Sequence, residues 1–360
     1  RMYREMNFEY YVYNRVDYQI KEQMIQNRSL EFNWQVSNDQ SILTHILYRH
    51  YSAPKGFDWE GAYPCCVPDS PHINEYNVEE RARVLINDLR TRATSFRTNH
   101  LLVAFGDDFE FRDAEKNFGN MSQLIRFINQ NKALFNVNIK YSLLSEYFDA
   151  IKSLSRNFPS FHGDLFPYAD NSNAYWTGYY TSRPVLKQWA RIGEAKAKAA
   201  ETLFVLSQAQ RSNGTLESFK TSYDHLEELR SANGYIQHHD GITGTERIDV
   251  VQMYLDYISS ALKKVSAVVS ESLSTLSSKS TIGNILFNHF IQDSGDLTSA
   301  PLNQMIPLVL FNSLGWSLRR TIRLLTLTDN VVVMDGSGNR VRFDTIPLYS
   351  DRGQRFHIVF

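Results

Sequence analysis

The sequence predicts a multidomain chain in which a parallel α/β sheet domain, a three-helix bundle and the start of an antiparallel β domain follow one another. Three observations predict this order. Strand and helix patterns alternate over residues 1–158, apolar residues recur with helical spacing over 159–280, and short strand patterns separated by turn signals fill 281–360. These three ranges are the predicted domains, and 360 residues are enough for them.

The first domain is predicted from alternating elements. Helix patterns cover residues 18–26 and 78–95, and strand patterns cover residues 10–15, 101–105 and 135–141. The run 101–105 is entirely apolar, which is typical of a strand buried on both faces. Ser142 is placed to cap a further helix that carries Leu144, Tyr147, Phe148 and Ile151. Alternation of this kind favours a parallel sheet.

The bundle is predicted from three helical stripes that follow an aromatic loop at residues 159–183. The first stripe runs from Leu186 to Phe204, the second helix spans about 215–238, and the third stripe runs from Val251 to Val269. Ser182 or Thr181 can cap the first helix, with Pro184 near its first turn. The sequence Thr243-Gly244-Thr245-Glu246 has the form of a capping box for the third helix.

The last region reads as short strands after a serine-rich linker or fraying helix end at residues 270–280. Asp335-Gly336-Ser337-Gly338-Asn339 is predicted to form a hairpin turn. Strand patterns cover residues 308–311, 321–328, 331–334, 341–343 and 357–360. Both chain ends fall inside sequence that looks folded, so we expect the chain to be a segment of a longer protein, with the α/β domain truncated at its N-terminus.

Composition limits the function classes. The 38 basic and 39 acidic residues nearly cancel, so nothing favours nucleic acid or an anionic membrane as partner. No apolar run approaches the ~18 residues of a membrane-spanning helix. Aromatic residues make up 13% of the chain, which fits either an aromatic-rich core or sugar stacking.

Cysteines and glycosylation motifs say little about the compartment. Cys65 and Cys66 are adjacent, a geometry that fits a mutual disulfide poorly, so both are free or their partners lie elsewhere. The motif Asn-x-Ser/Thr occurs at Asn27, Asn120 and Asn213, which permits secretion without establishing it.

One acidic pair follows the apolar run 101–105. Gly106-Asp107-Asp108-Phe109 would lie at the carboxyl end of a sheet strand, where open parallel sheets bind ligands. Adjacent side chains of a strand face opposite ways, so at most one carboxylate does acid/base work and the other orients it or binds substrate. The alternative is that both only cap a turn or the next helix.

The nonamer Gln237-His238-His239-Asp240-Gly241-Ile242-Thr243-Gly244-Thr245 is the second chemical signal. It would form the bend between two helices of the bundle. One histidine could ligate a metal, but zinc needs three or four ligands, so its partners must come from elsewhere. The alternative is a solvated histidine pair at a helix end.

An aromatic stretch precedes the bundle, namely Tyr168-Ala169-Asp170 and Tyr175-Trp176-Thr177-Gly178-Tyr179-Tyr180. Trp176 could form the floor beneath a sugar ring, since aromatic faces present large apolar area. The alternative is that these rings seal an interface between the sheet and the bundle.

Together these segments resemble, in this order, the class II α-mannosidases of glycoside hydrolase family 38. The resemblance is carried by Gly106–Phe109, by Gly163-Asp164-Leu165-Phe166-Pro167-Tyr168-Ala169-Asp170, by the stretch from Tyr175 to Pro184, and by the nonamer at 237–245. Arg15-Val16-Asp17-Tyr18-Gln19 and Arg97-Thr98-Asn99-His100 look more like the lysosomal than the Golgi branch. Phe311-Asn312-Ser313-Leu314-Gly315-Trp316 is similar to the entry into that family's β region.

The resemblance implies a zinc-dependent (Zn²⁺) retaining exo-α-mannosidase that removes terminal mannose from N-glycan-type oligosaccharides. Retaining enzymes use two carboxylates about 5 Å apart, a nucleophile and an acid/base. By resemblance, Asp108 is the acid/base and His239 the zinc ligand. The expected sugar-pocket residues are Arg15, Tyr51, Asp107, Trp176, His238 and Asp240.

The resemblance also implies what this chain does not contain. The family's nucleophile and its His-x-Asp zinc pair lie before the Arg15 region, so the chain alone is expected to be inactive and to need that N-terminal segment. The compartment expected is lysosomal or extracellular, with the Golgi lumen as the alternative. A non-catalytic carbohydrate-binding homologue and a metal-dependent carbohydrate deacetylase are the competing functions.

Overall fold

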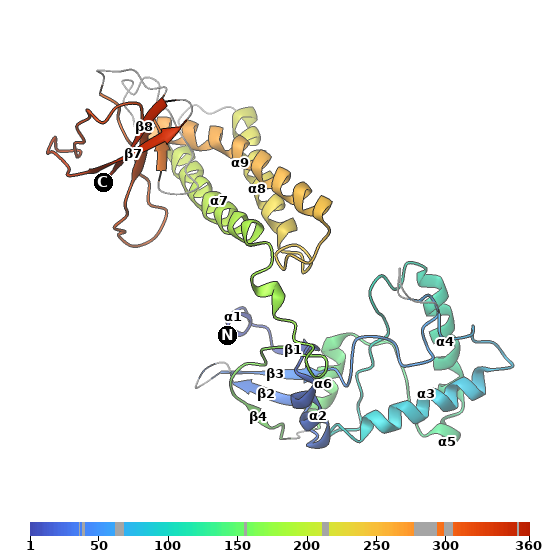
Figure 1. Ribbon diagram of the computed structural model, residues 1–360. Coiled ribbons are helices and arrows are strands. Elements are labelled where there is room, and N and C mark those ends of the chain that lie inside the picture. Colours follow the sequence, from blue (N-terminus) through green and yellow to red (C-terminus); the bar gives the residue numbers. More distant parts are fainter. Residues whose placement is uncertain are drawn as a thin grey trace. The chain divides into compact units, whose positions relative to one another are not determined.

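The computed structural model describes residues 1–35, 37, 40–61, 68–154, 157–210, 216–276, 294–298, 305–350 and 353–360. The chain divides into two compact units, Arg1–Thr177 and Gly178–Phe360 (Figure 1). Cys65, Cys66 and Asn213 lie outside the described residues. Within the described part of the chain, the search for a helix long and apolar enough to cross a bilayer finds no candidate.

The first unit is built on a mixed four-stranded sheet in the order β1-β3-β2-β4. Its strands are β1 (Tyr10–Tyr13), β2 (Glu31–Gln35), β3 (Ser41–Ile46) and β4 (Ser160–Phe161). The pairs β1–β3 and β2–β4 are parallel, while β2 and β3 pair in antiparallel fashion. The predicted α/β class with parallel strands is therefore confirmed, although one pair of neighbouring strands is antiparallel.

Among the described residues of this unit, six helices accompany the sheet. They are α1 (Met2–Glu5), α2 (Tyr18–Gln26), α3 (Val78–Ala93), α4 (Ala114–Gln130), α5 (Lys132–Phe135) and α6 (Leu144–Ser153). The Asp17 side chain caps α2 and the Asp113 side chain caps α4 by accepting backbone N–H groups of the first turn. Helices α3 and α4 share one apolar cluster, and α6 stacks Phe148 on Tyr10 of β1 at a ring distance of 4.5 Å.

Two predicted strands of this unit are wrong. Residues 101–105 and 135–141 form no strand, because neither segment has a hydrogen-bonded neighbour strand among the described residues. The burial pattern was nevertheless correctly anticipated for the first segment. Leu101, Val103 and Phe105 pack on the cluster of α3 and α4, whereas Leu102 packs on the cluster that contains α6.

Two polar predictions in this unit also change. Ser142 does not cap α6, since its hydroxyl donates to the Leu143 carbonyl, and Glu146 instead accepts the Leu143 N–H at 2.8 Å. Asn120 is 3% exposed and its side-chain oxygen accepts the Ile73 N–H at 2.7 Å. A glycan therefore cannot be accommodated on Asn120 in this fold, whereas Asn27 is exposed.

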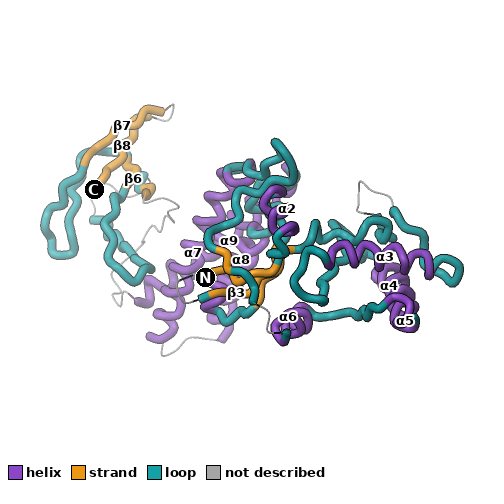
Figure 2. Tube along the Cα trace, turned by 90° about the horizontal axis from the view of Figure 1, so that it is seen from below, coloured by secondary structure: helices purple, strands orange, loops and turns teal. Residues whose placement is uncertain are grey.

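The second unit contains the predicted helical bundle. After a short 3-10 helix (Gly178–Tyr180), the long helices are α7 (Pro184–Gln210), α8 (Leu216–Ile236) and α9 (Ile248–Leu276), which lie side by side in both views (Figures 1 and 2). Their shared core holds Leu186, Phe204, Leu229, Ile236, Tyr254, Ile258 and Val265. Helix α9 continues through most of the stretch predicted as a serine-rich linker.

The predicted caps of the bundle are wrong. Helix α9 begins at Ile248, after the Thr243–Glu246 sequence, and Glu246 is a buried partner of Arg183 rather than a capping residue. Pro184 opens α7 as expected, but the Ser182 hydroxyl donates to the Gly244 carbonyl at 2.9 Å instead of capping the helix.

A small sheet forms the rest of this unit in the order β5-β6-β8-β7. Its strands are β5 (Ser294–Asp296), β6 (Arg323–Thr326), β7 (Asp344–Ser350) and β8 (Gly353–Val359). The turn at 335–339 is confirmed, since the Asp335 N–H donates to the Asn339 carbonyl and Gly338 has φ +83°. No strand forms at residues 308–311 or 341–343, and at 331–334 only Met334 makes a bridge, to Arg340.

Candidate functional site

The acidic pair of the first unit sits at the end of the extended run 101–105. The Ala53 N–H donates to the Gly106 carbonyl at 2.9 Å, which fixes the segment after β3 beside the pair. From that segment the Tyr51 hydroxyl donates to Asp108 Oδ1 at 3.0 Å. Asp108 is exposed and Asp107 is half-buried. A solvent-accessible carboxylate with one fixed hydrogen-bond donor is a suitable acid/base group.

The two neighbouring carboxylates make different contacts. Asp107 Oδ1 accepts the Asp108 N–H at 2.8 Å, and the Asp107 carbonyl accepts the Glu110 N–H at 3.2 Å. Burial lowers the pKa of His50, and the negative charge of Asp107 opposes that shift. Asp107 therefore shapes the local backbone and charge, whereas Asp108 presents its carboxylate outward.

An aromatic and cationic cluster adjoins the pair. The Arg15 guanidinium lies 4.4 Å from the ring centre of Trp176 and 5.7 Å from that of Tyr168, distances typical of cation–π contact. Trp176 is 43% exposed. Burial raises the pKa of Tyr51, a hydrogen bond from Arg15 opposes the rise, and the bond to Asp108 adds to it. Arg15 thus connects Trp176 to Tyr51.

Asp170 holds this cluster together, and sequence reasoning did not single it out as a site residue. Its Oδ2 accepts the indole N–H of Trp176 at 2.7 Å, and its Oδ1 accepts the Tyr168 hydroxyl. Burial, with the Asp170 carboxylate second, raises the pKa of Tyr168 to about 12. The only signal in the sequence was the position of Asp170 inside a motif quoted for the resemblance.

The second unit places His238, His239 and Asp240 together in the exposed turn after α8. Their ligand atoms lie within 4.8 Å of one another, and His238 Nε2 is 3.7 Å from Asp240 Oδ2. The two imidazole rings are 4.4 Å apart between centres. Two nitrogen donors and one oxygen donor match the ligands that zinc accepts, so these residues fit a zinc site in chemistry.

We call residues 237–245 the histidine turn, and its shape is set mostly by short-range bonds. The Thr243 hydroxyl donates to the His239 carbonyl at 2.5 Å, and the Thr245 hydroxyl donates to Asp240 Oδ1 at 2.8 Å. Gly244 adopts φ +73°, and a Cβ there would lie 2.7 Å from the Ser182 carbonyl oxygen. The turn therefore requires glycine at position 244.

The start of α7 clamps the histidine turn from the other side. Lys187 Nζ donates to the Ile242 carbonyl at 2.7 Å, and Arg183 donates to the Glu246 carbonyl at 2.8 Å. Burial lowers the pKa of Lys187, and Glu246 opposes that shift. The candidate metal-ligating side chains are thus followed by a backbone that is tied at Ile242, Gly244 and Glu246.

The predicted site residues fall into two groups. Contacts within the first unit join Arg15, Tyr51, Asp107, Asp108 and Trp176, and the second unit holds His238, His239 and Asp240. Whether the two groups converge on one cavity stays a prediction, because they belong to separate units.

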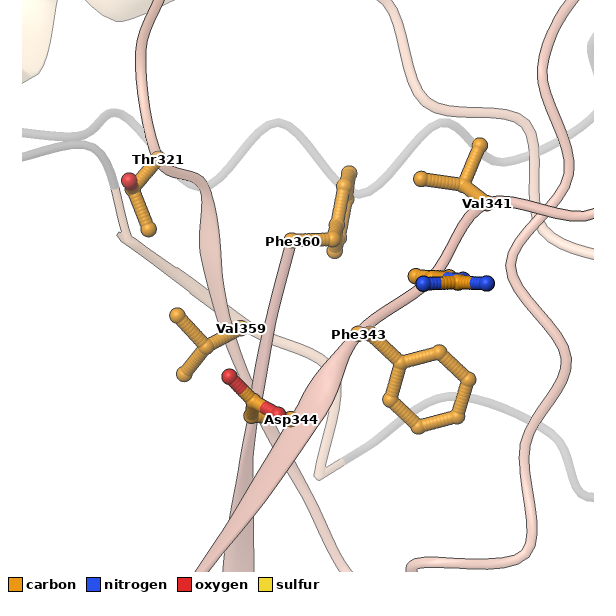
Figure 3. Close-up of a pocket in the computed structure, with 7 residues that line it drawn as sticks. Thr321, Val341, Phe343, Asp344, Val359 and Phe360 are labelled. Atoms are coloured by element: carbon orange, nitrogen blue, oxygen red, sulfur yellow. The ribbon is translucent and has the colours of Figure 1, made fainter.

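A hollow in the small sheet lies away from these residues in the sequence. It has a volume of about 640 Å³ and is lined by residues in and next to the last strands, none of them a predicted site residue. Figure 3 shows the side chains that line it. Its lining residues are Thr321, Val341, Arg342, Phe343, Asp344, Val359 and Phe360. Because it contains no group suited to glycoside chemistry other than Asp344, we assign it no role.

Comparison with known proteins identifies the family. The profile described as "Glycosyl hydrolases family 38 N-terminal domain" matches residues 1–171, and the profile described as "Alpha mannosidase middle domain" matches residues 174–276. Lysosomal alpha-mannosidase from Dictyostelium discoideum is 31% identical over 354 residues, which is 95% of this chain and 35% of that protein.

Two further relatives and one solved structure agree with this result. Alpha-mannosidase from Canavalia ensiformis is 32% identical, covering 96% of this chain and 35% of the relative. Alpha-mannosidase 2 from Mus musculus is 34% identical, covering 74% of this chain and 26% of the relative. The crystal structure of an alpha-mannosidase from Enterococcus faecalis V583 shares the fold with a TM-score of 0.55 at 15% identity, covering 92% of this chain and 36% of that one.

The chain spans about a third of the length of curated relatives such as the Dictyostelium discoideum and Canavalia ensiformis proteins. The two profiles together cover the sheet unit and the bundle in their family order. The chain belongs to glycoside hydrolase family 38, the family of the class II α-mannosidases.

Proposed function

We propose that this chain is part of a zinc-dependent retaining exo-α-mannosidase that releases terminal α-mannose from N-glycan-type oligosaccharides. The observation that carries the proposal is the contact chain from Trp176 through Arg15 and Tyr51 to Asp108. It brings together an exposed aromatic face, a cation and a carboxylate within the first compact unit of the chain, most of which the family 38 N-terminal profile matches. That combination suits a sugar ring next to an acid/base group.

Asp108 acts as the acid/base. In the first step it donates its proton to the glycosidic oxygen as the bond to the mannose carbon breaks, and in the second step it takes a proton from the attacking water. The Tyr51 hydroxyl holds the carboxylate in place through its bond to Oδ1. Asp107 fixes the backbone N–H of Asp108 and contributes to substrate binding.

Trp176 offers its exposed indole to an apolar face of the mannose ring. Asp170 fixes the orientation of the indole through the Nε1–H bond, and Arg15 lies over the ring at 4.4 Å. Arg15 also provides positive charge where the negative nucleophile of a retaining mechanism is needed.

His239 ligates zinc, while His238 and Asp240 bind sugar hydroxyls beside it. When bound, zinc supplies Lewis-acid stabilisation of the vicinal hydroxyl groups of the sugar. Zinc sites have three or four protein ligands, so His239 supplies one ligand of a larger set. We therefore expect residues 1–360 alone to be inactive.

The relatives suggest where the protein works. The first relative described above is named lysosomal, and the sequence features near Arg15 resemble that branch, so we propose a lysosomal or extracellular location. The Golgi lumen is the alternative. The family match leaves the metal-dependent deacetylase without support, because that reading rested on fold analogy alone.

The test uses the full-length protein that carries this chain. Release of 4-nitrophenol from the aryl α-mannoside should fall by at least about 100-fold in Asp108→Asn and after zinc removal, and zinc should restore it. Full activity after either treatment would refute the proposal. Mannoside binding without any turnover in the wild-type protein would instead identify a carbohydrate-binding homologue.

A further inference from the structure

The turn that follows Asp108 has an unfavourable backbone. Phe109 and Phe111 adopt φ +62° and φ +64°, a region that side chains other than glycine, asparagine and aspartate seldom occupy. Phe109 is 64% exposed, so burial of its ring does not explain the conformation. Such residues persist only where surrounding contacts hold them. The turn must therefore be held by groups outside it.

Glu60 supplies those contacts. Its Oε2 accepts the Phe111 N–H at 2.5 Å and the Asn117 side-chain N–H at 2.6 Å, while its Oε1 accepts the Asp113 N–H at 2.7 Å. Both oxygens of one carboxylate are thus used on the turn and on the first residues of α4. No other side chain contributes as many hydrogen bonds to this turn among the interactions of the described residues.

The segment that carries Glu60 is itself fixed. Asp58 Oδ1 accepts the N–H groups of Glu60 and Gly61 at 3.0 and 2.7 Å. Trp59 is 1% exposed, and its ring stacks on that of Phe105 at 6.2 Å. Phe105 lies just before the acidic pair and Phe111 just after it, so one segment holds the backbone on both sides of Asp108.

A second carboxyl group accompanies Glu60. Glu110 interacts electrostatically with Glu60, and its Oε1 is buried without a hydrogen-bond partner among the described residues. Burial, followed by the charges of Asp58 and Glu60, raises the pKa of Glu110 to about 7. Burial also opposes ionisation of Glu60, but the N–H groups of Asp113 and Phe111 outweigh it and lower the Glu60 pKa. The pair therefore favours a charged Glu60 beside a neutral Glu110.

We propose that Glu60 is a positioning residue for Asp108: by holding the turn at residues 109–113, it sets where the acid/base carboxylate lies relative to the glycosidic oxygen. The inference rests on the proposed role of Asp108 as acid/base. Glu60 touches no substrate in this scheme. It acts through the backbone that connects the two residues.

The experiment compares leaving groups in the full-length enzyme, using Glu60→Ala, Glu60→Gln and, as matched control, Glu115→Gln. Glu115 is exposed in the first turn of α4. A misplaced general acid slows departure of a poor leaving group such as methanol, whereas 2,4-dinitrophenolate leaves without proton donation. The value compared is kcat/KM, which reports the steps up to glycoside bond cleavage.

In Glu60→Ala, kcat/KM for methyl α-mannoside should fall by about 100-fold, the scale expected for a displacement of about 1 Å. For 2,4-dinitrophenyl α-mannoside it should fall by less than about threefold. Glu60→Gln keeps one acceptor oxygen and should recover about a tenth of wild-type activity on the methyl glycoside. Glu115→Gln should match the wild type on both substrates.

Equal losses on the two substrates would overturn the proposal, since they indicate a smaller folded fraction and not a misplaced acid. If Glu60→Ala does not fold, the proposal is tested in Glu60→Gln by the same comparison of kcat/KM on the methyl and 2,4-dinitrophenyl mannosides. Wild-type behaviour of both Glu60 variants would also overturn it. Retained activity of Asp108→Asn on methyl α-mannoside is a separate result, which removes the proposed function itself.

Discussion

The two groups of candidate residues are built in opposite ways. Asp108 is positioned by side chains from far along the chain, with Tyr51 57 residues away and Glu60 51 residues from Phe111. The histidine turn is also tied to Ser182 and Lys187, but it adds bonds over four and five residues, from Thr243 to His239 and from Thr245 to Asp240. Local bonds can be recognised in a short motif, whereas the contacts around Asp108 exist only after folding.

The largest effect is expected in the histidine turn, because its backbone tolerates no side chain at position 244. Gly244→Ala combines φ +73° with a Cβ only 2.7 Å from the Ser182 carbonyl oxygen. We expect it to lower the free energy of unfolding by about 2–4 kcal/mol, measured by urea denaturation.

The matched control for this substitution is Gly234→Ala, on α8 of the same bundle. No atom lies within 4 Å of a Cβ built there. Alanine in a helix interior should stabilise the protein by about 0.5–1 kcal/mol relative to glycine. If the two variants were equally stable, the clamp between Ser182 and Gly244 would not define the turn.

The second prediction concerns Asp108, which is positioned by residues far along the chain. Tyr51→Phe removes the hydroxyl that donates to Asp108 Oδ1. A hydrogen bond to a charged group contributes about 1.5–3 kcal/mol, so kcat/KM on an aryl α-mannoside should fall by about 10- to 100-fold. Tyr76→Phe is the control, because Tyr76 is 91% exposed. Equal kinetics of the two variants would mean that Tyr51 does not position Asp108.

A third prediction tests whether the short-range bonds matter for the metal. Thr245→Val leaves the shape of the side chain nearly unchanged but removes a hydroxyl that bonds to the Thr243 hydroxyl, which in turn donates to the carbonyl of the proposed ligand His239. Loss of such an outer contact should weaken zinc binding by about tenfold, measured by competition with a chelator. Thr221→Val, on the exposed surface of α8, should leave the affinity unchanged. An unchanged affinity in Thr245→Val would show that the two threonine hydroxyls do not position His239 for zinc.

The comparison also explains which elements could be predicted. Helix α2 was predicted with its observed ends, because Asp17 and the apolar spacing are both local signals. Residues 101–105 were predicted correctly as buried on two sides, but a strand also needs a partner, which no local pattern reveals. The predicted capping box failed because Glu246 pairs with Arg183, the residue just before α7.

The same limit applies to the site. The motifs identified the acidic pair and the histidine turn, since their residue types are chemical signals in themselves. Asp170 and Glu60 were not singled out, because an isolated carboxylate in a loop has no distinguishing pattern. Asp170 bonds to Trp176, which is 6 residues further along the chain, and Glu60 bonds to Asn117, which is 57 residues further along.

The smallest effect concerns the pH dependence of the long-range region. Glu110 has an ordinary pKa of 4.5 that folding raises to about 7, so the folded state favours its neutral form. The stability it contributes is fully present below pH 4.5 and is lost as the pH rises through about 7.

Glu110→Gln keeps a neutral donor beside Glu60 and should remove this loss, whereas Glu115→Gln should retain it. The measurement is the urea midpoint at pH 5 and at pH 8. The pKa of Glu60 is lowered from 4.5, so Glu60 changes the stability only below pH 4.5. The effects of the two carboxyl groups on stability therefore fall in different pH ranges. An unchanged difference between the two midpoints in Glu110→Gln would show that the Glu60–Glu110 pair does not couple stability to pH.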